Sequence, residues 1–257
     1  MKEIEKNLEK GQHFLINEEV LKKEIQIAEI SKKDKIIEIG SGEGILTKEL
    51  VKKSQKVLSF EIDKQYENIL KELEKSNPNL KIIYSDATKY SWKGFNKIIS
   101  NIPYYLAEKI IIKAVIENIP FLVLIVGENF KNIIEKKLTK SGIITDVFYD
   151  TKFIEKIEKN SFSPAPRVNS WLIKLELKDK NNNSEFIKNI IKRKGKIKNS
   201  IVYSLIEKGY SKKQAKIMLK NFGIENNVLE SSTNRISGKT ILKIINKYRD
   251  LFINPKL

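Results

Sequence analysis

Residues 36–44 read Ile-Ile-Glu-Ile-Gly-Ser-Gly-Glu-Gly, an apolar run that ends in three alternating glycines. Glycines in a turn between a strand and a helix let the backbone approach a ligand closely. Further apolar runs of strand length are Val57–Phe60, Lys81–Tyr84, Lys97–Ser100 and Phe121–Val126. Helical patterns lie between the strands, over Gly44–Lys53, Lys64–Glu74, Ala107–Glu117 and Glu128–Thr139. This alternation predicts an α/β fold with a doubly wound parallel sheet.

The last third of the chain has a different pattern. Two runs, Ile143–Tyr149 and Ser170–Leu177, are predicted to be strands that close the sheet. The polar, turn-prone stretch Asp179–Ser184 is predicted to be a linker. Helical spacing of Ile and Leu follows over Phe186–Lys208, Lys212–Phe222 and Lys239–Phe252. We therefore expect an α/β domain at 1–178, with an N-terminal helical segment, and a small all-helical domain at 179–257.

Composition excludes several classes of protein. The 257 residues include no cysteine and one histidine, so disulfides, cysteine-based zinc sites and histidine-rich metal sites are excluded, and we expect no metal. No apolar stretch reaches the ~20 residues that span a bilayer. The charged N-terminus, MKEIEKNLEK, is unlike a signal peptide. We expect a soluble, cytoplasmic monomer.

The net charge of +17 is unevenly distributed. From Lys178 onward there are 19 basic and 6 acidic residues, a net charge of +13, which leaves +4 for the rest. A concentrated positive field suits a polyphosphate partner such as RNA. Arg193, Lys194, Lys196 and Lys198 form the densest basic stretch, which we expect to contact phosphates. The alternative is a solvated helix face in a lysine-rich protein.

The glycine turn and two downstream acids indicate a cofactor site. The spacing Glu-x-Gly-x-Gly-x-Gly differs from the Gly-x-Gly-x-x-Gly of dinucleotide binders and is typical of S-adenosylmethionine enzymes. Glu61 ends the second predicted strand, where a carboxylate can accept hydrogen bonds from ribose hydroxyls. Asp86 follows the third predicted strand. The alternative for each acid is a helix cap, which Asp63 fits better than Glu61 does.

The fourth strand ends in Asn101-Ile102-Pro103-Tyr104. An amide and nearby carbonyls can accept hydrogen bonds from an exocyclic amine, and the tyrosine ring offers a stacking face for a flat base. Pro103 fixes its own φ and holds the turn rigid. The glycine loop, Glu61, Asp86 and Asn101 therefore follow four successive strands, in register with one another.

Together these motifs make the chain resemble the rRNA adenine N6-dimethyltransferases, which include the KsgA-type small-subunit enzymes, their archaeal and eukaryotic counterparts and, more distantly, the Erm enzymes. The resemblance runs from about Gly11 to Leu177 and more loosely to Arg249. Its most specific marks are the segments Gly11–Leu15 (GQHFL) and Phe162–Ser170 (FSPAPRVNS). The family helix that opens Gln-x-Glu after the fifth strand is replaced here by Val126-Gly127-Glu128, and the later Arg is also missing.

The resemblance implies a class I S-adenosylmethionine-dependent methyltransferase fold of Rossmann-like type and a role for each matching position. Cofactor contacts are implied for Gln12, His13, Leu15, Gly40, Gly42, Glu61, Asp86, Ala87 and Asn101. The catalytic residues implied are Asn101, Pro103, Tyr104 and Phe162. Of these, Asn101 and Tyr104 would hold the target base, and Phe162 would close its other side. A purely structural role stays open for two of these residues. His13 can be a turn residue with no catalytic or binding role, and Phe162 can be a core residue.

The function implied is transfer of methyl groups from S-adenosyl-L-methionine to the N6 amines of two adjacent adenosines near the 3′ end of small-subunit rRNA. The partner would be that rRNA or a pre-small ribosomal subunit. The basic helical segment and FSPAPRVNS favour this over an Erm-type large-subunit enzyme. Two more functions stay open at this point. The chain could be a ribosome-assembly or transcription factor that uses the fold to bind nucleic acid, or a methyltransferase of a different nucleic acid.

Overall fold

In the computed structural model the chain is described over residues 13–137, 139–178 and 182–252. Its contacts group into two compact units. The first comprises Met1–Asn132 and Tyr149–Leu177, and the second comprises Ile133–Phe148 and Lys178–Leu257. Residues 133–148 therefore group by their contacts with the second unit, although in sequence they lie within the predicted α/β domain. The two functional domains at 1–178 and 179–257 stay a prediction.

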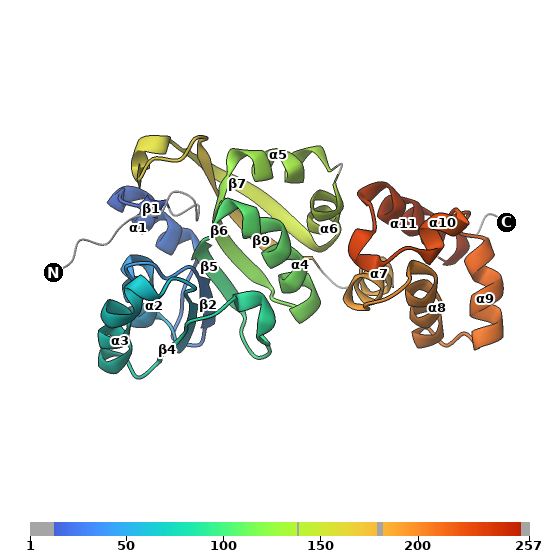
Figure 1. Cartoon of the computed structure of the whole chain (residues 1–257), viewed down its shortest axis with the longest axis horizontal. Helices are drawn as coiled ribbons and strands as arrows, with labels where there is room; N and C mark the ends of the chain where they lie inside the picture. Colours follow the sequence, from blue (N-terminus) through green and yellow to red (C-terminus); the bar gives the residue numbers. More distant parts are fainter. Residues whose placement is uncertain (1–12, 138, 179–181, 253–257) are drawn as a thin grey trace. The chain divides into compact units, whose positions relative to one another are not determined.

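The first unit is built on a seven-stranded sheet (Figure 1). The strand order is β4 (Leu80–Ile83), β3 (Lys56–Phe60), β2 (Lys35–Ile39), β5 (Lys97–Asn101), β6 (Phe121–Gly127), β9 (Ser170–Leu177) and β7 (Tyr149–Ile157). The first five are parallel, whereas β9 pairs antiparallel with both β6 and β7. The predicted parallel sheet is confirmed, and β9 has the predicted bounds.

The strand order of the sheet reverses between β2 and β5. The chain runs outward from β2 through β3 to β4, then returns to place β5 on the other side of β2. Where strand order reverses, the loops at the carboxyl ends of the two central strands separate and leave a crevice. The fold therefore places a binding site at the ends of β2 and β5.

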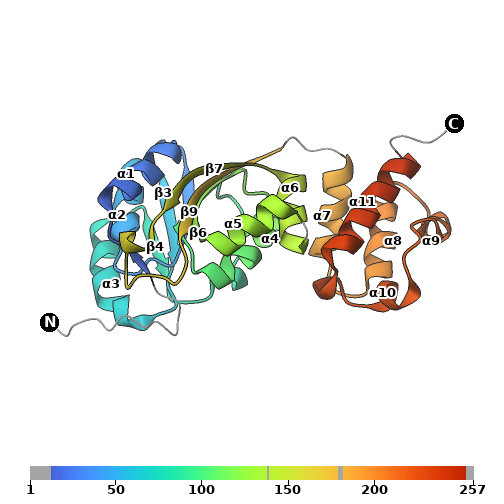
Figure 2. The same ribbon diagram turned by 90° about the horizontal axis from the view of Figure 1, so that it is seen from above.

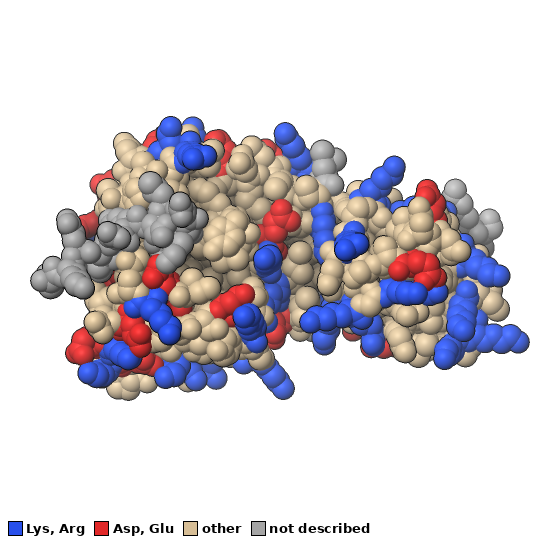
Figure 3. Space-filling model, viewed as in Figure 1, with Lys and Arg blue, Asp and Glu red and all other residues tan. Residues whose placement is uncertain are grey.

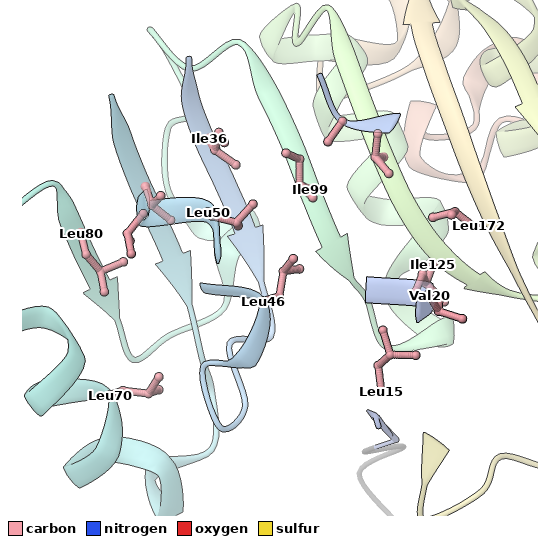
Figure 4. Packing of buried hydrophobic residues seen from close by; sticks show 14 of the residues in the cluster. Leu15, Val20, Ile36, Leu46, Leu50, Leu70, Leu80, Ile99, Ile125 and Leu172 are labelled. Atoms are coloured by element: carbon pink, nitrogen blue, oxygen red, sulfur yellow. The ribbon is translucent and has the colours of Figure 1, made fainter. Parts of the chain in front are cut away.

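Apolar side chains from helices and strands form the core beside the sheet. The helices of this unit are α1 (Glu18–Ile27), α2 (Ile45–Lys53), α3 (Glu67–Ser76) and α4 (Ala107–Glu117). Leu50 and Leu70 on α2 and α3 are fully buried in a cluster with Ile36 of β2 and Leu80 of β4 (Figure 4). Burying such a side chain stabilises the fold by about 1.5–3 kcal/mol. This packing fixes the glycine loop between β2 and α2.

The prediction of a strand at Ile143–Tyr149 is wrong, because Lys140–Phe148 forms helix α6. The β-branched residues in this stretch favour a strand locally. However, the Thr139 hydroxyl accepts from the Gly142 N–H and caps the helix, and Ile143 and Ile144 are buried. Tertiary burial therefore overrides local propensity, and β7 follows α6 instead.

The second unit is helical throughout its described part (Figure 2). Besides α6 and the end of α5 (Glu128–Lys136), it contains α7 (Asn182–Lys192), α8 (Ile197–Glu207), α9 (Lys212–Lys220), α10 (Asn226–Glu230) and α11 (Gly238–Phe252). The single helical run predicted at Phe186–Lys208 is two helices separated at Gly195. The linker prediction at Asp179–Ser184 is wrong for its second half, since α7 begins at Asn182. Across the described residues, no helix is both long and apolar enough to cross a bilayer.

Candidate functional site

A cavity of about 580 Å³ opens at the carboxyl ends of β2, β3 and β5 in the first unit. This volume lies within the range of roughly 300–1,000 Å³ that is usual for small-molecule sites. The cavity is lined by all the described residues that are predicted to hold the cofactor and the target base: His13, Leu15, Gly40, Gly42, Glu61, Asp86, Ala87, Asn101, Pro103, Tyr104 and Phe162. The structure thus brings these residues together, whereas Gln12 lies outside the described residues. Their individual roles stay predictions.

Glu61 organises the glycine loop. Its Oε2 accepts from the Gly42 N–H at 2.8 Å, and its Oε1 accepts from the Ile62 and Asp63 N–H groups at 2.8 Å each. Burial raises the pKa of Glu61, and these three amides oppose the rise. Gly42 has φ +51°, and a Cβ there would lie 2.6 Å from the Phe14 ring, so only glycine fits this turn.

Asp86 is a helix cap, and its predicted contact with the cofactor stays compatible with that cap. Its Oδ1 accepts from the Thr88 hydroxyl at 2.7 Å and from the Thr88 N–H at 2.8 Å, which caps the short 3₁₀ helix η3 (Ala87–Lys89). The Thr88 hydroxyl is also the main reason that the pKa of Asp86 is lowered. A carboxylate has two oxygens, so capping through Oδ1 leaves Oδ2 for a ligand. Asp63 is a cap as predicted, since it accepts from the Gln65 N–H.

The Tyr104 ring is held tightly at the end of β5. Its hydroxyl shares a 2.5 Å hydrogen bond with the hydroxyl of Ser170 on β9. A Cβ on Gly127, the last residue of β6, would lie 2.7 Å from the ring. The Tyr104 ring therefore occupies the space that a side chain at 127 would need, which explains why a glycine stands at this position.

The described part of the GQHFL segment, His13–Leu15, meets the beginning of FSPAPRVNS in space. Strand β1 (Phe14–Leu15) pairs antiparallel with β8 (Phe162–Ser163), and Leu15 lies opposite Phe162. The His13 Nδ1 is 2.8 Å from the Pro164 carbonyl oxygen, to which it donates when protonated. The His13 ring stacks towards Tyr104 with centroids 6.1 Å apart. Phe162 is only 5% exposed, so it lines the cavity and packs in the core at the same time.

A buried acid that the sequence motifs did not indicate lies behind Asn101. Glu24 of α1 has no exposed surface, and the Asn101 side-chain amide faces it; in the orientation that satisfies both amide atoms, the nitrogen donates to Glu24 Oε1 at 3.1 Å and Oε2 at 3.3 Å. Burial, and then the nearby Glu38 carboxyl, raise the pKa of Glu24 to about 8. A sequence signal existed, because Val20, Glu24 and Ala28 share the inward face of α1 at helical spacing. An acid within an apolar stripe is unusual and calls for a partner.

Most of the predicted phosphate-contacting residues form ion pairs within the second unit. We call Arg193, Lys194, Lys196 and Lys198 the α8 entry cluster. Arg193 pairs with Glu207 at 2.6 Å, and both Lys196 and Lys198 pair with Glu230. Lys194 is exposed.

A second basic surface, which charge density along the sequence did not single out, lies on α9. It consists of four exposed lysines, Lys212, Lys213, Lys216 and Lys220, which we call the α9 lysine face. Figure 3 shows basic side chains spread over the visible face of the C-terminal helices, with a few acidic ones between them. Among the described residues of the second unit, the α8 entry cluster is largely paired with acids, and the α9 lysine face is a separate exposed basic surface.

The residues around the cavity fit S-adenosylmethionine. Two carboxylates, on Glu61 and Asp86, can accept hydrogen bonds from the ribose hydroxyls and the adenine amine. The glycine turn brings backbone rather than side chains to the cavity wall, as close approach of a ligand requires. The Tyr66 hydroxyl, in the same wall, is buried without a hydrogen-bond partner in the described chain.

Comparisons with known proteins agree with this fit. A sequence profile described as "Ribosomal RNA adenine dimethylase" matches residues 4–248. "Probable ribosomal RNA small subunit methyltransferase A" of Methanococcus maripaludis is 35% identical over 240 residues, covering 89% of this chain and 88% of that protein. "Ribosomal RNA small subunit methyltransferase A" of Clostridium botulinum is 38% identical over 184 residues, covering 66% of each.

A solved structure supports the fold independently. A dimethyladenosine transferase from Plasmodium falciparum superposes with a TM-score of 0.62 at 22% identity, covering 93% of this chain and 98% of that one. At this identity the likeness bears on the fold alone. The profile match extends over nearly the whole sequence and includes both the glycine loop and the C-terminal helices. The chain therefore belongs to the ribosomal RNA adenine dimethylase family of S-adenosylmethionine-dependent methyltransferases.

Proposed function

We propose that this protein methylates the N6 amines of two adjacent adenosines near the 3′ end of small-subunit rRNA, during ribosome biogenesis. The observation that carries the proposal is that Asn101 and Tyr104 border the same cavity as the glycine loop and Glu61. A base held at the end of β5 would thus lie next to a cofactor held at the end of β2. The names of the two relatives favour the small subunit over the large one.

The methyl donor is held by the loops after β2, β3 and β4 in this proposal. Glu61 accepts a hydrogen bond from a ribose hydroxyl. The Asp86 Oδ2 accepts a hydrogen bond from the adenine amine, beside the backbone of Ala87. His13 and Leu15 border the methionine end. The amides that surround the Glu61 carboxylate fix its orientation before the ligand binds, which lowers the entropic cost of binding.

The chemistry requires a competent nucleophile. The sulfonium cofactor supplies an activated methyl group whose sulfur leaves as a neutral thioether. The adenine N6 lone pair is delocalised into the ring and is a poor nucleophile. Asn101 Oδ1 and the Ile102 carbonyl oxygen accept the N6 hydrogens, which favours a tetrahedral nitrogen with its lone pair directed at the methyl group. Positioning and fixed dipoles supply most of the rate in such a site.

The adenine must leave its stack to reach the cavity. Tyr104 stacks on one face of the base, and Phe162 closes the other side. The hydroxyl bond to Ser170 supports this role, because it fixes the Tyr104 ring before the base arrives. Pro103 holds the turn that connects the ring to β5.

The helical segment at 179–257 contacts RNA phosphates in this proposal, and the protein acts as a cytoplasmic monomer on rRNA or a pre-small subunit. The α8 entry cluster is available despite its ion pairs, since exposed pairs contribute only about 0–1 kcal/mol. Phosphates can therefore displace Glu207 and Glu230 as partners. The α9 lysine face offers a second, independent set of phosphate contacts.

The test supplies labelled S-adenosylmethionine to immature small subunits, large subunits and naked rRNA, and maps the modified base. We expect label on two adjacent adenosines of small-subunit rRNA. Asn101→Ala should abolish labelling while the affinity for S-adenosylmethionine, measured by calorimetry, stays nearly unchanged. Label confined to large subunits, or normal turnover by Asn101→Ala, would refute the proposal.

A further inference from the structure

The side-chain amide of Asn101 has two chemically different ends. Oδ1 only accepts hydrogen bonds, and Nδ2 only donates them. The target amine presents hydrogens to the cavity, so the amide serves it only with Oδ1 facing the cavity. A rotation of the amide by half a turn would direct two N–H groups at the amine and repel it. Whatever fixes this rotation therefore controls whether the site can work.

The buried partner of this amide is Glu24. One terminal atom of the Asn101 amide lies 3.1 Å from Oε1 and 3.3 Å from Oε2, so both carboxyl oxygens face the same amide, and assigning this atom as the nitrogen lets it donate to them. An ionised carboxylate accepts hydrogen bonds and cannot donate one. Facing an ionised Glu24, the amide therefore turns its nitrogen inward and its oxygen outward. Glu24 itself is fully buried, so water does not compete for these contacts.

We propose that Glu24 is a positioning residue for methyl transfer: its buried carboxylate holds the nitrogen of Asn101 and thereby turns Oδ1 towards the target amine. This inference rests on the proposed function and adds a residue that does not line the cavity. Glu24 acts only through Asn101 and touches neither the base nor the methyl donor.

The arrangement also makes methyl transfer sensitive to pH. A protonated Glu24 can donate to the Asn101 Oδ1, which reverses the amide and directs Nδ2 at the cavity. Glu38 on β2 is the charged group that acts on Glu24 through space, and Glu38 in turn accepts from Thr47 and Ser59. Burial and Glu38 raise the pKa of Glu24 to about 8, so the rate should increase as pH rises through about 8.

The primary experiment measures single-turnover methylation at saturating S-adenosylmethionine between about pH 6.5 and 9.5. In Glu24→Gln, the new amide can pair with Asn101 in either rotation. We expect the rate constant to fall by about three- to tenfold at alkaline pH, and the rising limb to disappear, with unchanged affinity for S-adenosylmethionine. Glu19 is an exposed acid on the same helix, so Glu19→Gln is the matched control. This variant should retain the wild-type rate and the rising limb of the pH profile.

Removing the neighbouring acid, Glu38, gives a second test of the rising limb of the pH–rate profile. Glu38→Gln removes a like charge, so the limb should move to lower pH but persist. A merely structural role for Glu24 would lower the amount of folded protein and leave the shape of the pH profile unchanged. A wild-type rate and a wild-type limb in folded Glu24→Gln would overturn the inference.

A measurement on the wild-type chain covers the case in which Glu24→Gln does not fold. The side-chain amide signals of Asn101, assigned by their loss in Asn101→Ala, should shift with a midpoint near that of the rate limb. Constant signals across this range would overturn the inference. If Asn101→Ala is inactive while Glu24→Gln is normal, only this inference fails. Normal turnover by Asn101→Ala would instead refute the proposed function.

Discussion

Replacing Glu24 with glutamine is predicted to stabilise the folded chain, by an amount that grows with pH. The carboxyl of Glu24 has an ordinary pKa of 4.5, and burial together with Glu38 raises the pKa to about 8 in the folded chain. Between these two values the unfolded chain is ionised at this position while the folded chain keeps the proton. The free energy of unfolding of the wild type therefore falls as pH rises from about 4.5 to about 8, and levels off above that.

The size of the effect follows from the two pKa values. Each unit of difference corresponds to about 1.4 kcal/mol, so the interval from 4.5 to about 8 corresponds to on the order of 5 kcal/mol. Glutamine does not ionise and avoids this cost. The advantage of Glu24→Gln should be near zero at pH 4.5 and increase by about 1.4 kcal/mol per pH unit. Glu38, whose pKa is raised to about 7 mainly by burial, leaves a smaller pH dependence in both proteins.

The assay is urea unfolding followed by tryptophan fluorescence at several pH values. Both tryptophans, Trp92 and Trp171, belong to the first unit, so the signal reports on the unit that contains Glu24. The quantity compared is the difference in free energy of unfolding between Glu24→Gln and the wild type. Parallel pH profiles for the two proteins would refute the assignment of a raised pKa to Glu24. Agreement would mean that the site retains a carboxyl that costs stability, as functional sites often do.

Three further predictions concern the cavity and the basic surfaces. Gly127→Ala should lower the methylation rate about tenfold with little change in cofactor affinity, because its Cβ displaces the Tyr104 ring; an unchanged rate would show that the ring tolerates the shift. Gly42→Ala should weaken S-adenosylmethionine binding, measured by calorimetry, at least about tenfold, whereas Gly94→Ala, which also has positive φ but open space around it, should not. Neutralising the α8 entry cluster or the α9 lysine face should each flatten the salt dependence of rRNA binding, and a slope that stays the same in both variants would argue against phosphate contacts in this unit.

The sequence was sufficient for the five parallel strands, for β9 and for most of the cavity, but not for β7. Strands such as Phe121–Gly127 are continuous apolar runs, which buried parallel strands require, so their positions follow from composition alone. The glycine turn, Glu61 and Asn101 follow successive strands, and parallel strands bring their carboxyl ends to one edge. Helix α6 was missed because Ile143 and Ile144 favour a strand until the Thr139 cap and their burial decide otherwise.

The sequence by itself determined which groups converge on the cavity, because strand order and motif spacing are local or periodic properties of the chain. Only the tertiary structure decided what lies behind those groups. The contact between Glu24 and Asn101 joins α1 to the end of β5, 77 residues apart, and no periodicity encodes it. The Tyr104 ring against Gly127 is another such contact. Contacts between elements distant in sequence depend on how the layers pack, so the rotation of the Asn101 amide is a property of the folded core.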